Sequence, residues 1–423
     1  MRREIIESDI GESYVKAVLN NGLKIYILEK TGYNSSYAIF GTKYGSIDTT
    51  FSVNGEETTV PEGIAHFLEH KLFESEDGDA FSKYAKTGAY ANAFTSFDRT
   101  CYLFSCSDKF YDNLDILLSF VQSPYFTEET VKKEQGIIGQ EIRMYDDSPG
   151  WRVMFNMLTA MYRNHPVRID IAGTVESIAE IDYDLLYKCY NTFYHPSNMF
   201  ICIAGNVDTE KVLKQIKNSI KHRDDLELNR ITADEPQEIV KPYVEQKLAV
   251  AQPIFCFGYK EAIHVPERSV KKKICSALAL EIIAGEASPL YKELIEEGLI
   301  NDEFSFEHFN GYGYSSFIFE GESKDPQAVA ERIKKEITRI KEEGIDKKLF
   351  SAVRCGMYGN AIRSFDSVEG IAMQMVDCAM QDTGLFDDIK YLKSVTVDDC
   401  FKTIQKFDNE NTVLSVILPS EEV

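Results

Sequence analysis

Several residue types are scarce in this chain of 423 residues, which has 7 His, 1 Trp and 12 Pro. Basic residues are also outnumbered: 46 Lys and Arg stand against 68 Asp and Glu, so the formal net charge is −22. A strongly acidic protein is repelled by phosphate groups, so we expect neither nucleic acid nor a membrane as a partner. The charge is compatible with a basic or unfolded polypeptide as substrate.

Long apolar runs are missing as well. No uninterrupted apolar stretch approaches the length that spans a bilayer, and Met1–Asp9 has basic residues with no apolar run behind them. We therefore expect no membrane segment, no secretory signal and a cytoplasmic location. The nine cysteines form no C-x-x-C pair. This argues against a disulfide framework or a cysteine zinc site and favours buried, reduced thiols.

The chain contains enough apolar sequence for two large domains. Hydrophobic residues make up 44% and charged residues 27% of it, as in a globular protein. Its 423 residues exceed one ordinary core. A polar, acidic stretch at 226–245 is the best linker candidate. It divides the chain into an N-terminal domain, 1–225, and a C-terminal domain, 246–423.

The predicted elements follow the same order in both halves. Each half closes with a helix followed by an apolar strand, Met199–Ala204 in the first and Thr412–Leu418 in the second. This predicts an internal duplication of α/β units of about 200 residues. The other predicted elements are a hairpin at 14–29, helices at 80–87, 108–122 and 183–193, strands at 89–95, 101–106 and 250–258, helices near 267–284 and 288–297, strands at 303–309 and 314–320, and helices within 325–402.

The segment Pro61–Glu74 has the pattern of an amphipathic helix that starts behind a proline. His66 and His70 are four residues apart, so on a helix their imidazoles project from one face. Glu69 borders that face. Two neutral imidazoles at this spacing can bind one divalent metal ion, and an adjacent carboxylate can take a proton from water.

A single histidine on such a helix is more often a core or surface residue than a ligand. Here the residues form H-x-x-E-H, the inverse of H-E-x-x-H and a metallopeptidase signature. A catalytic zinc site takes three protein ligands, and any acidic residue could supply the third. The helix predicted after Thr127 offers Glu134 and Glu141, seven residues apart and so on one face. Without the histidines, a solvated acidic helix would be the favoured interpretation of these two residues.

Together these residues resemble the insulinase, pitrilysin and mitochondrial processing peptidase family, the inverzincins, and the resemblance covers essentially the whole chain. In that family the later of two glutamates seven residues apart binds zinc. The resemblance therefore implies a Zn²⁺ ion held by His66, His70 and Glu141. It assigns Glu69 as the catalytic base and Glu134 as a catalytic residue that supports a ligand or the water.

The resemblance also extends to a strand and to the fold. Asn92, Ala93 and Phe94 resemble the N-A-x-T edge strand on which a peptide substrate lies as an added strand. For Asn92, a turn-capping role is the alternative. The implied fold class is α+β: two homologous α/β repeats of about 200 residues, each a mostly antiparallel sheet with helices on one face, together half of a clamshell.

The implied activity is that of a zinc-dependent endopeptidase acting on peptides or small unfolded polypeptides in a closed chamber. One feature departs from the family: where active members have an arginine and a tyrosine, this chain has Ile295 and Asn301. We therefore expect a heterodimer whose other, related chain supplies that pair, with a homodimer as the alternative. A non-catalytic assembly subunit of the same fold is the competing hypothesis.

Overall fold

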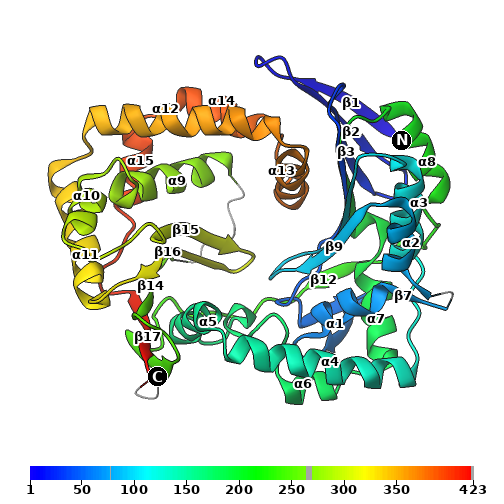
Figure 1. The fold of residues 1–423 in the computed structure, drawn as a ribbon, viewed down its shortest axis with the longest axis horizontal. Helices are drawn as coiled ribbons and strands as arrows, with labels where there is room; N and C mark the ends of the chain where they lie inside the picture. The colour runs from blue at the N-terminus through cyan, green and yellow to red at the C-terminus, as the bar shows by residue number, and fades with distance from the viewer. Residues whose placement is uncertain (77, 263–268, 421–423) are drawn as a thin grey trace. The chain divides into compact units, whose positions relative to one another are not determined.

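The computed structural model of the chain describes residues 1–76, 78–262 and 269–420, and Figure 1 labels its elements. Two compact units divide the chain. Unit 1 consists of Met1–Ile142, Asp170–Ile231 and Ile362–Phe386. Unit 2 consists of Arg143–Ile169, Thr232–Ala361 and the chain from Asp387 onward.

These units cross the predicted division into 1–225 and 246–423 twice. Residues 143–169 belong to unit 2, and residues 362–386 belong to unit 1. The predicted linker 226–245 is also divided, because it contains part of the sheet structure of each unit.

Unit 1 is built on a seven-stranded sheet in the order β1-β2-β3-β11-β4-β10-β9, in which β9 is an edge strand. The strands are β1 (Arg2–Glu7), β2 (Ser13–Val18), β3 (Lys24–Glu29), β4 (Ser36–Thr42), β9 (Tyr90–Thr95), β10 (Thr100–Cys106) and β11 (Met199–Gly205). One small sheet joins β12 (Leu228–Arg230), β5 (Thr50–Val53) and β6 (Glu56–Thr59). A second pairs β7 (Glu74–Ser75) with β8 (Gly78–Asp79).

The helices of unit 1 come from both halves of the sequence. They are α1 (Ile64–Leu72), α2 (Ala80–Thr87), α3 (Phe110–Val121), most of α4 (Glu128–Asp146), α6 (Val175–Ala179), α7 (Tyr183–Phe193), α8 (Thr209–Ser219) and α13 (Val368–Gln381), with short 3-10 turns η2 (Pro196–Asn198) and η3 (Ser364–Asp366).

Unit 2 is built on a five-stranded sheet in the order β13-β17-β14-β16-β15. Its strands are β13 (Tyr243–Leu248), β14 (Ile254–Lys260), β15 (Ser305–Gly311), β16 (Tyr314–Glu322) and β17 (Thr412–Pro419). Its helices are α5 (Pro149–Met161), η1 (Pro166–Arg168), α9 (Val270–Ala284), α10 (Pro289–Glu296), α11 (Pro326–Glu343), most of α12 (Lys347–Arg363), α14 (Asp387–Ser394) and α15 (Val397–Ile404). The first residues of the helix predicted near 267 lie outside the described ranges.

Strand pairing agrees with the predicted duplication. In unit 1 the run β3-β11-β4-β10-β9 has one parallel pair, β3 with β11, followed by three antiparallel pairs. In unit 2 the run β13-β17-β14-β16-β15 has one parallel pair, β13 with β17, followed by three antiparallel pairs. The two sheets therefore share order and direction, and the α+β fold of two mostly antiparallel repeats is confirmed.

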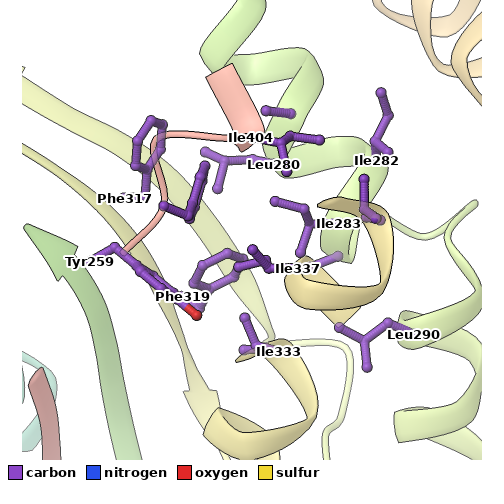
Figure 2. Close-up of a cluster of buried hydrophobic side chains, with 14 of the residues drawn as sticks. Tyr259, Leu280, Ile282, Ile283, Leu290, Phe317, Phe319, Ile333, Ile337 and Ile404 are labelled. Carbon is purple, nitrogen blue, oxygen red and sulfur yellow. The ribbon is translucent and has the colours of Figure 1, made fainter. Parts of the chain in front are cut away.

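Each sheet packs its main helices on one face. In unit 2, Figure 2 shows side chains of β14 and β16 meeting those of α9 and α11 in a cluster of buried apolar residues. The labelled members are Tyr259, Leu280, Ile282, Ile283, Leu290, Phe317, Phe319, Ile333, Ile337 and Ile404. Burying large apolar side chains of this kind is the main source of stability for such a unit.

One further helix covers the opposite face of each sheet. In unit 1, α13 packs against β11 and β4, and Tyr37 of β4 donates a 3.4 Å hydrogen bond to its Glu369. In unit 2, α5 packs against β17 and β14 so closely that a Cβ at Gly258 would lie 2.6 Å from the Met161 side chain. Each covering helix comes from the other half of the sequence, which explains why the units cross the predicted division.

A buried ion pair fixes the segment that the sequence marks as a linker. Lys260 Nζ lies 2.7 Å from Glu235 Oε1, and the two side chains are 0% and 2% exposed. Lys260 also donates to the carbonyl of Met161 at 3.0 Å, while Glu235 accepts the backbone N–H groups of Arg163 and Asn164. This part of the linker is therefore anchored in unit 2.

All nine cysteines are free, and all but Cys355 are buried, which agrees with the predicted reduced thiols. Within the described ranges, no single helix has the length and apolar character to cross a membrane. Among the described residues, one pair of helices, α9 and α10, meets that criterion when taken together, with a bend of 41° at the break between them.

Candidate metal centre

Helix α1 carries the two histidines of the predicted motif. It begins after Gly63, whose φ of 85° suits glycine, and a Cβ there would lie 2.3 Å from the carbonyl oxygen of Ala172. All of the helix except His70 is buried. His66 and His70 project from one face, with their ring centroids 4.6 Å apart.

Helix α4 brings the predicted third ligand to the same place. One oxygen of Glu141 lies 3.7 Å from His66 Nε2, and the other lies 3.4 Å from His70 Nε2. One donor atom from each of these three residues lies within 4.8 Å of the other two. The three predicted ligands thus converge within unit 1.

The spacing of these donor atoms fits a divalent ion. Tetrahedral zinc holds nitrogen and oxygen ligands at about 2.0–2.1 Å, which places two ligand atoms about 3.3 Å apart. The separations of 3.4 and 3.7 Å are near that value. Both exceed the roughly 2.7–2.9 Å of a charge-assisted hydrogen bond. The donor set therefore suits one shared ion better than direct pairing between its members.

The state of His66 also suits a metal ligand. Burial, helped by the neighbouring His70, lowers the pKa of His66 to about 4. The imidazole is therefore neutral near pH 7, as ligation requires. Its Nδ1 is buried and has no hydrogen-bond partner among the described residues.

Glu134 holds the second histidine. His70 Nδ1 lies 2.9 Å from Glu134 Oε1. Because an ionised carboxylate can only accept, Nδ1 carries the proton and Nε2 keeps its lone pair for a metal. Burial alone would lower the pKa of His70, but the bond to Glu134 and the nearby carboxylates raise it overall. Burial would raise the pKa of Glu134, but the bond to His70 lowers it overall.

Glu69, the predicted base, lies on the same helix and is 9% exposed. Its Oε2 accepts a 2.7 Å hydrogen bond from the hydroxyl of Thr95. Burial raises the pKa of the Glu69 carboxyl, and Thr95 and His70 offset only part of that rise. A carboxylate with a raised pKa is well suited to take and release a proton near neutral pH. Thr95 is the last residue of the N-A-x-T pattern, and the sequence alone assigns it no role.

The predicted substrate-binding residues lie on β9, which pairs with β10 and forms the edge of its sheet. The backbone N–H of Ala93 donates to Asn92 Oδ1 at 2.9 Å, so it points away from β10. Phe94 pairs across the sheet with Cys101. Thr95, the next residue of the same strand, donates its hydroxyl to Glu69.

The two residues that depart from the resembled family lie in unit 2. Ile295 is near the end of α10 and is 39% exposed. Asn301 donates to Glu322 Oε2 at 3.1 Å. Neither side chain can supply the cation or phenol that the family pattern has at these places.

Comparison with known proteins defines the class. Residues 55–175 match the family described as "Insulinase (Peptidase family M16)", and residues 180–356 match the one described as "Peptidase M16 inactive domain". A relative described as the uncharacterized zinc protease YmfH of Bacillus subtilis strain 168 is 43% identical over 413 residues, 96% of each chain. The chain therefore belongs to the insulinase (M16 peptidase) family, and the resemblance stated from its sequence is confirmed.

Other relatives agree with this placement. The zinc protease PqqE of Helicobacter pylori is 25% identical over 390 residues, covering 88% of this chain and 87% of that protein. A crystal structure described as an M16-like peptidase from Alicyclobacillus acidocaldarius matches with a TM-score of 0.94 and 34% identity, covering 98% of this chain and 100% of that one. A Helicobacter pylori protease matches in fold alone, with a TM-score of 0.82, 20% identity and coverage of 96% and 99%.

Proposed function

We propose that the protein is a zinc-dependent endopeptidase. The observation that carries the proposal is that one donor atom each of His66, His70 and Glu141 lie within 4.8 Å of one another, with both Nε2 atoms near the Glu141 carboxylate. Two imidazoles and one carboxylate form a donor set used by catalytic zinc, with a position left for water. Relatives described as zinc proteases support the choice of metal and reaction.

A zinc ion held by His66, His70 and Glu141 would supply Lewis acidity, which polarises a carbonyl oxygen and makes water more acidic. The remaining steps belong to the chain itself. Glu69 accepts a proton from the water as it attacks the scissile carbonyl, and then gives that proton to the leaving amine. Its raised pKa suits the first transfer, because a more basic carboxylate accepts the proton more readily.

Glu134 acts through His70. The 2.9 Å contact to Nδ1 fixes the tautomer of His70 and keeps Nε2 available as a donor atom. The charge of Glu134 also makes His70 a stronger base. Glu134 is thus a supporting residue of the site, in line with the role that the family resemblance implies.

The substrate would bind as an added strand on β9. Ala93 points its N–H to the open edge, where Asn92 Oδ1 now accepts it. An extended peptide could take over this hydrogen bond and others along the strand, and Phe94 and Asn92 would meet its side chains. Recognition through the backbone predicts broad specificity for peptides and small unfolded polypeptides, consistent with a closed chamber that selects by size.

A partner chain would complete the site. This chain has Ile295 and Asn301 where active relatives are expected to have an arginine and a tyrosine, groups that bind substrate and stabilise the developing oxyanion. A related chain in a heterodimer would supply them, and a homodimer with substitute residues is the alternative. We place the complex in the cytoplasm, and we expect no nucleic acid or membrane in it.

The proposal is tested with a peptide library, using the purified chain alone and together with a co-expressed related chain. Cleavage should occur in at least one of these forms, stop after treatment with a zinc chelator, and return when zinc is added back. Cleavage that needs the second chain would support the heterodimer, and full activity as a homodimer would contradict it. Purified protein without stoichiometric zinc, inactive in both forms, would favour a non-catalytic assembly subunit.

A further inference from the structure

Thr95 connects the edge strand β9 to the proposed base. It is the last residue of β9, and its hydroxyl oxygen lies 2.7 Å from Glu69 Oε2. The same oxygen lies 3.4 Å from the hydroxyl of Thr100, its partner across the β9–β10 pair. All three residues belong to unit 1.

The hydroxyl protons in this group can be assigned. The hydroxyl of Thr100 donates to the carbonyl of Tyr44 at 2.9 Å, which uses its single proton. An ionised carboxylate only accepts, and 2.7 Å is a much shorter contact than 3.4 Å. The proton of Thr95 is therefore directed at Glu69 Oε2.

This bond has a specific consequence for a glutamate. The last torsion of a glutamate side chain has broad, shallow minima, so its own geometry does not fix the plane of the carboxylate. A donor on one oxygen sets that plane and distinguishes the two oxygens. In Glu69 this donor is the hydroxyl of Thr95, and the oxygen that it holds is Oε2.

We propose that Thr95 is a positioning residue, whose hydroxyl orients the Glu69 carboxylate for proton transfer and ties it to the strand that holds the peptide. This inference rests on the proposed function. Asn92 and Thr95 are three positions apart on β9, which corresponds to about 10 Å along a strand. The peptide and the base would thus be aligned by one strand, so that the scissile bond and the carboxylate keep a fixed spacing.

The test compares kcat and KM for one cleaved peptide in zinc-loaded full-length variants. Thr95→Val replaces the hydroxyl with a methyl group and keeps nearly the same shape. Thr95→Ala removes the hydroxyl without adding a methyl group, in case valine disturbs folding. Thr95→Ser keeps the donor. Thr42→Val is the matched control, because Thr42 is a buried threonine at the same level of the sheet, two strands away, whose hydroxyl donates to the carbonyl of Phe193.

We expect Thr95→Val and Thr95→Ala to lower kcat by about 10- to 100-fold, since misaligned general-base catalysis loses part of its roughly 10²–10⁴-fold contribution. KM should stay within about twofold, and Thr95→Ser should recover most of the loss. Thr42→Val should keep its kcat even if it unfolds at a lower temperature. Zinc content should remain one ion per chain throughout, and the zinc-free proteins should all fold, as measured by thermal unfolding.

A kcat within about twofold of wild type in both Thr95→Val and Thr95→Ala would overturn the inference. So would an equal loss in Thr95→Ser, or an equal loss of kcat in Thr42→Val, because either would indicate a general structural effect. These outcomes leave the proposed function standing, since the wild type still cleaves the peptide. A wild type that carries zinc but cleaves nothing would overturn the proposed function and this inference together.

Discussion

The two histidines of α1 are held differently, although they occupy equivalent places on one helix face. Nδ1 of His70 is bonded to Glu134, whereas Nδ1 of His66 is buried with no hydrogen-bond partner among the described residues. On its Nδ1 side, His66 is therefore held by packing, while His70 is held there by a charged acceptor. Two acidic residues on α4 consequently have separate tasks, one as proposed ligand and one as support.

This division of tasks leads to a graded prediction for zinc affinity. Glu141→Ala removes a proposed ligand and should abolish stoichiometric zinc binding. Glu134→Gln keeps a polar contact to His70 but loses the charge, so zinc affinity should fall by about 10- to 100-fold. Competition titration with a zinc-binding dye measures both values. A loss in Glu134→Gln as large as that in Glu141→Ala would mean that the assignment of the two glutamates is wrong.

Single residues also mark the limit of what the sequence could reveal about the site. His66, Glu69 and His70 are close in sequence and form a named motif, so their common face follows from helix geometry. Glu141 had to be taken from the family resemblance, because its meeting with His66 depends on how two helices pack. Thr95 has no such signal by itself, and its contact with Glu69 depends on the end of β9 reaching α1.

At the scale of elements, β9 combines an open edge with a link to the site. Its Ala93 N–H points away from β10 and would be the donor to a bound peptide. Proline is tolerated in an edge strand when its missing N–H faces outward. Position 93 therefore allows one proposed substrate contact to be removed while the pairing with β10 is kept.

We expect Ala93→Pro to raise KM about fivefold, because one net hydrogen bond contributes about 1 kcal/mol. Zinc content should not change, and Ala93→Gly, which keeps the N–H, is the matched control. Steady-state kinetics on one peptide measure the effect. The measurement is repeated with a peptide whose backbone N–H opposite Ala93 is N-methylated and cannot donate. An unchanged KM in Ala93→Pro would argue against substrate binding along β9.

For some elements, local sequence patterns predict the bounds correctly. The helices predicted at 80–87 and 183–193 have these same bounds in α2 and α7, since both have clear caps and apolar periodicity. Local patterns did not predict strand β13, and they did not place the helices that cover the far sheet faces. Periodicity shows that α5 and α13 have an apolar face, but it does not show which sheet they cover.

At the scale of the whole molecule, the duplicated sheets carry unequal chemistry. Both repeats have the same strand order, yet the proposed metal ligands lie only in unit 1. The order in which strands and helices recur predicted the duplication, and the family resemblance implied the mostly antiparallel sheets. The sequence placed the division at 226–245, whereas two exchanged segments and the anchored Glu235 show that contacts cross that boundary.

The unequal repeats suit a protein whose zinc chemistry is local and whose substrate contacts extend to another chain. In the proposed account, α1 and α4 provide metal binding and proton transfer, β9 provides the peptide strand, and a related chain provides the missing cation and phenol. Metal binding should then be independent of the partner, whereas turnover depends on it. The two properties can be separated by one substitution at the proposed base.

Glu69→Gln provides that separation, because it removes the base and keeps the shape of the side chain and all three proposed ligands. The measurement is zinc content per chain together with cleavage of a peptide that the wild type cleaves, alone and with the related chain. The account predicts one zinc ion per chain and a loss of cleavage of at least about 10²-fold. Cleavage by Glu69→Gln at a substantial fraction of the wild-type rate would contradict it.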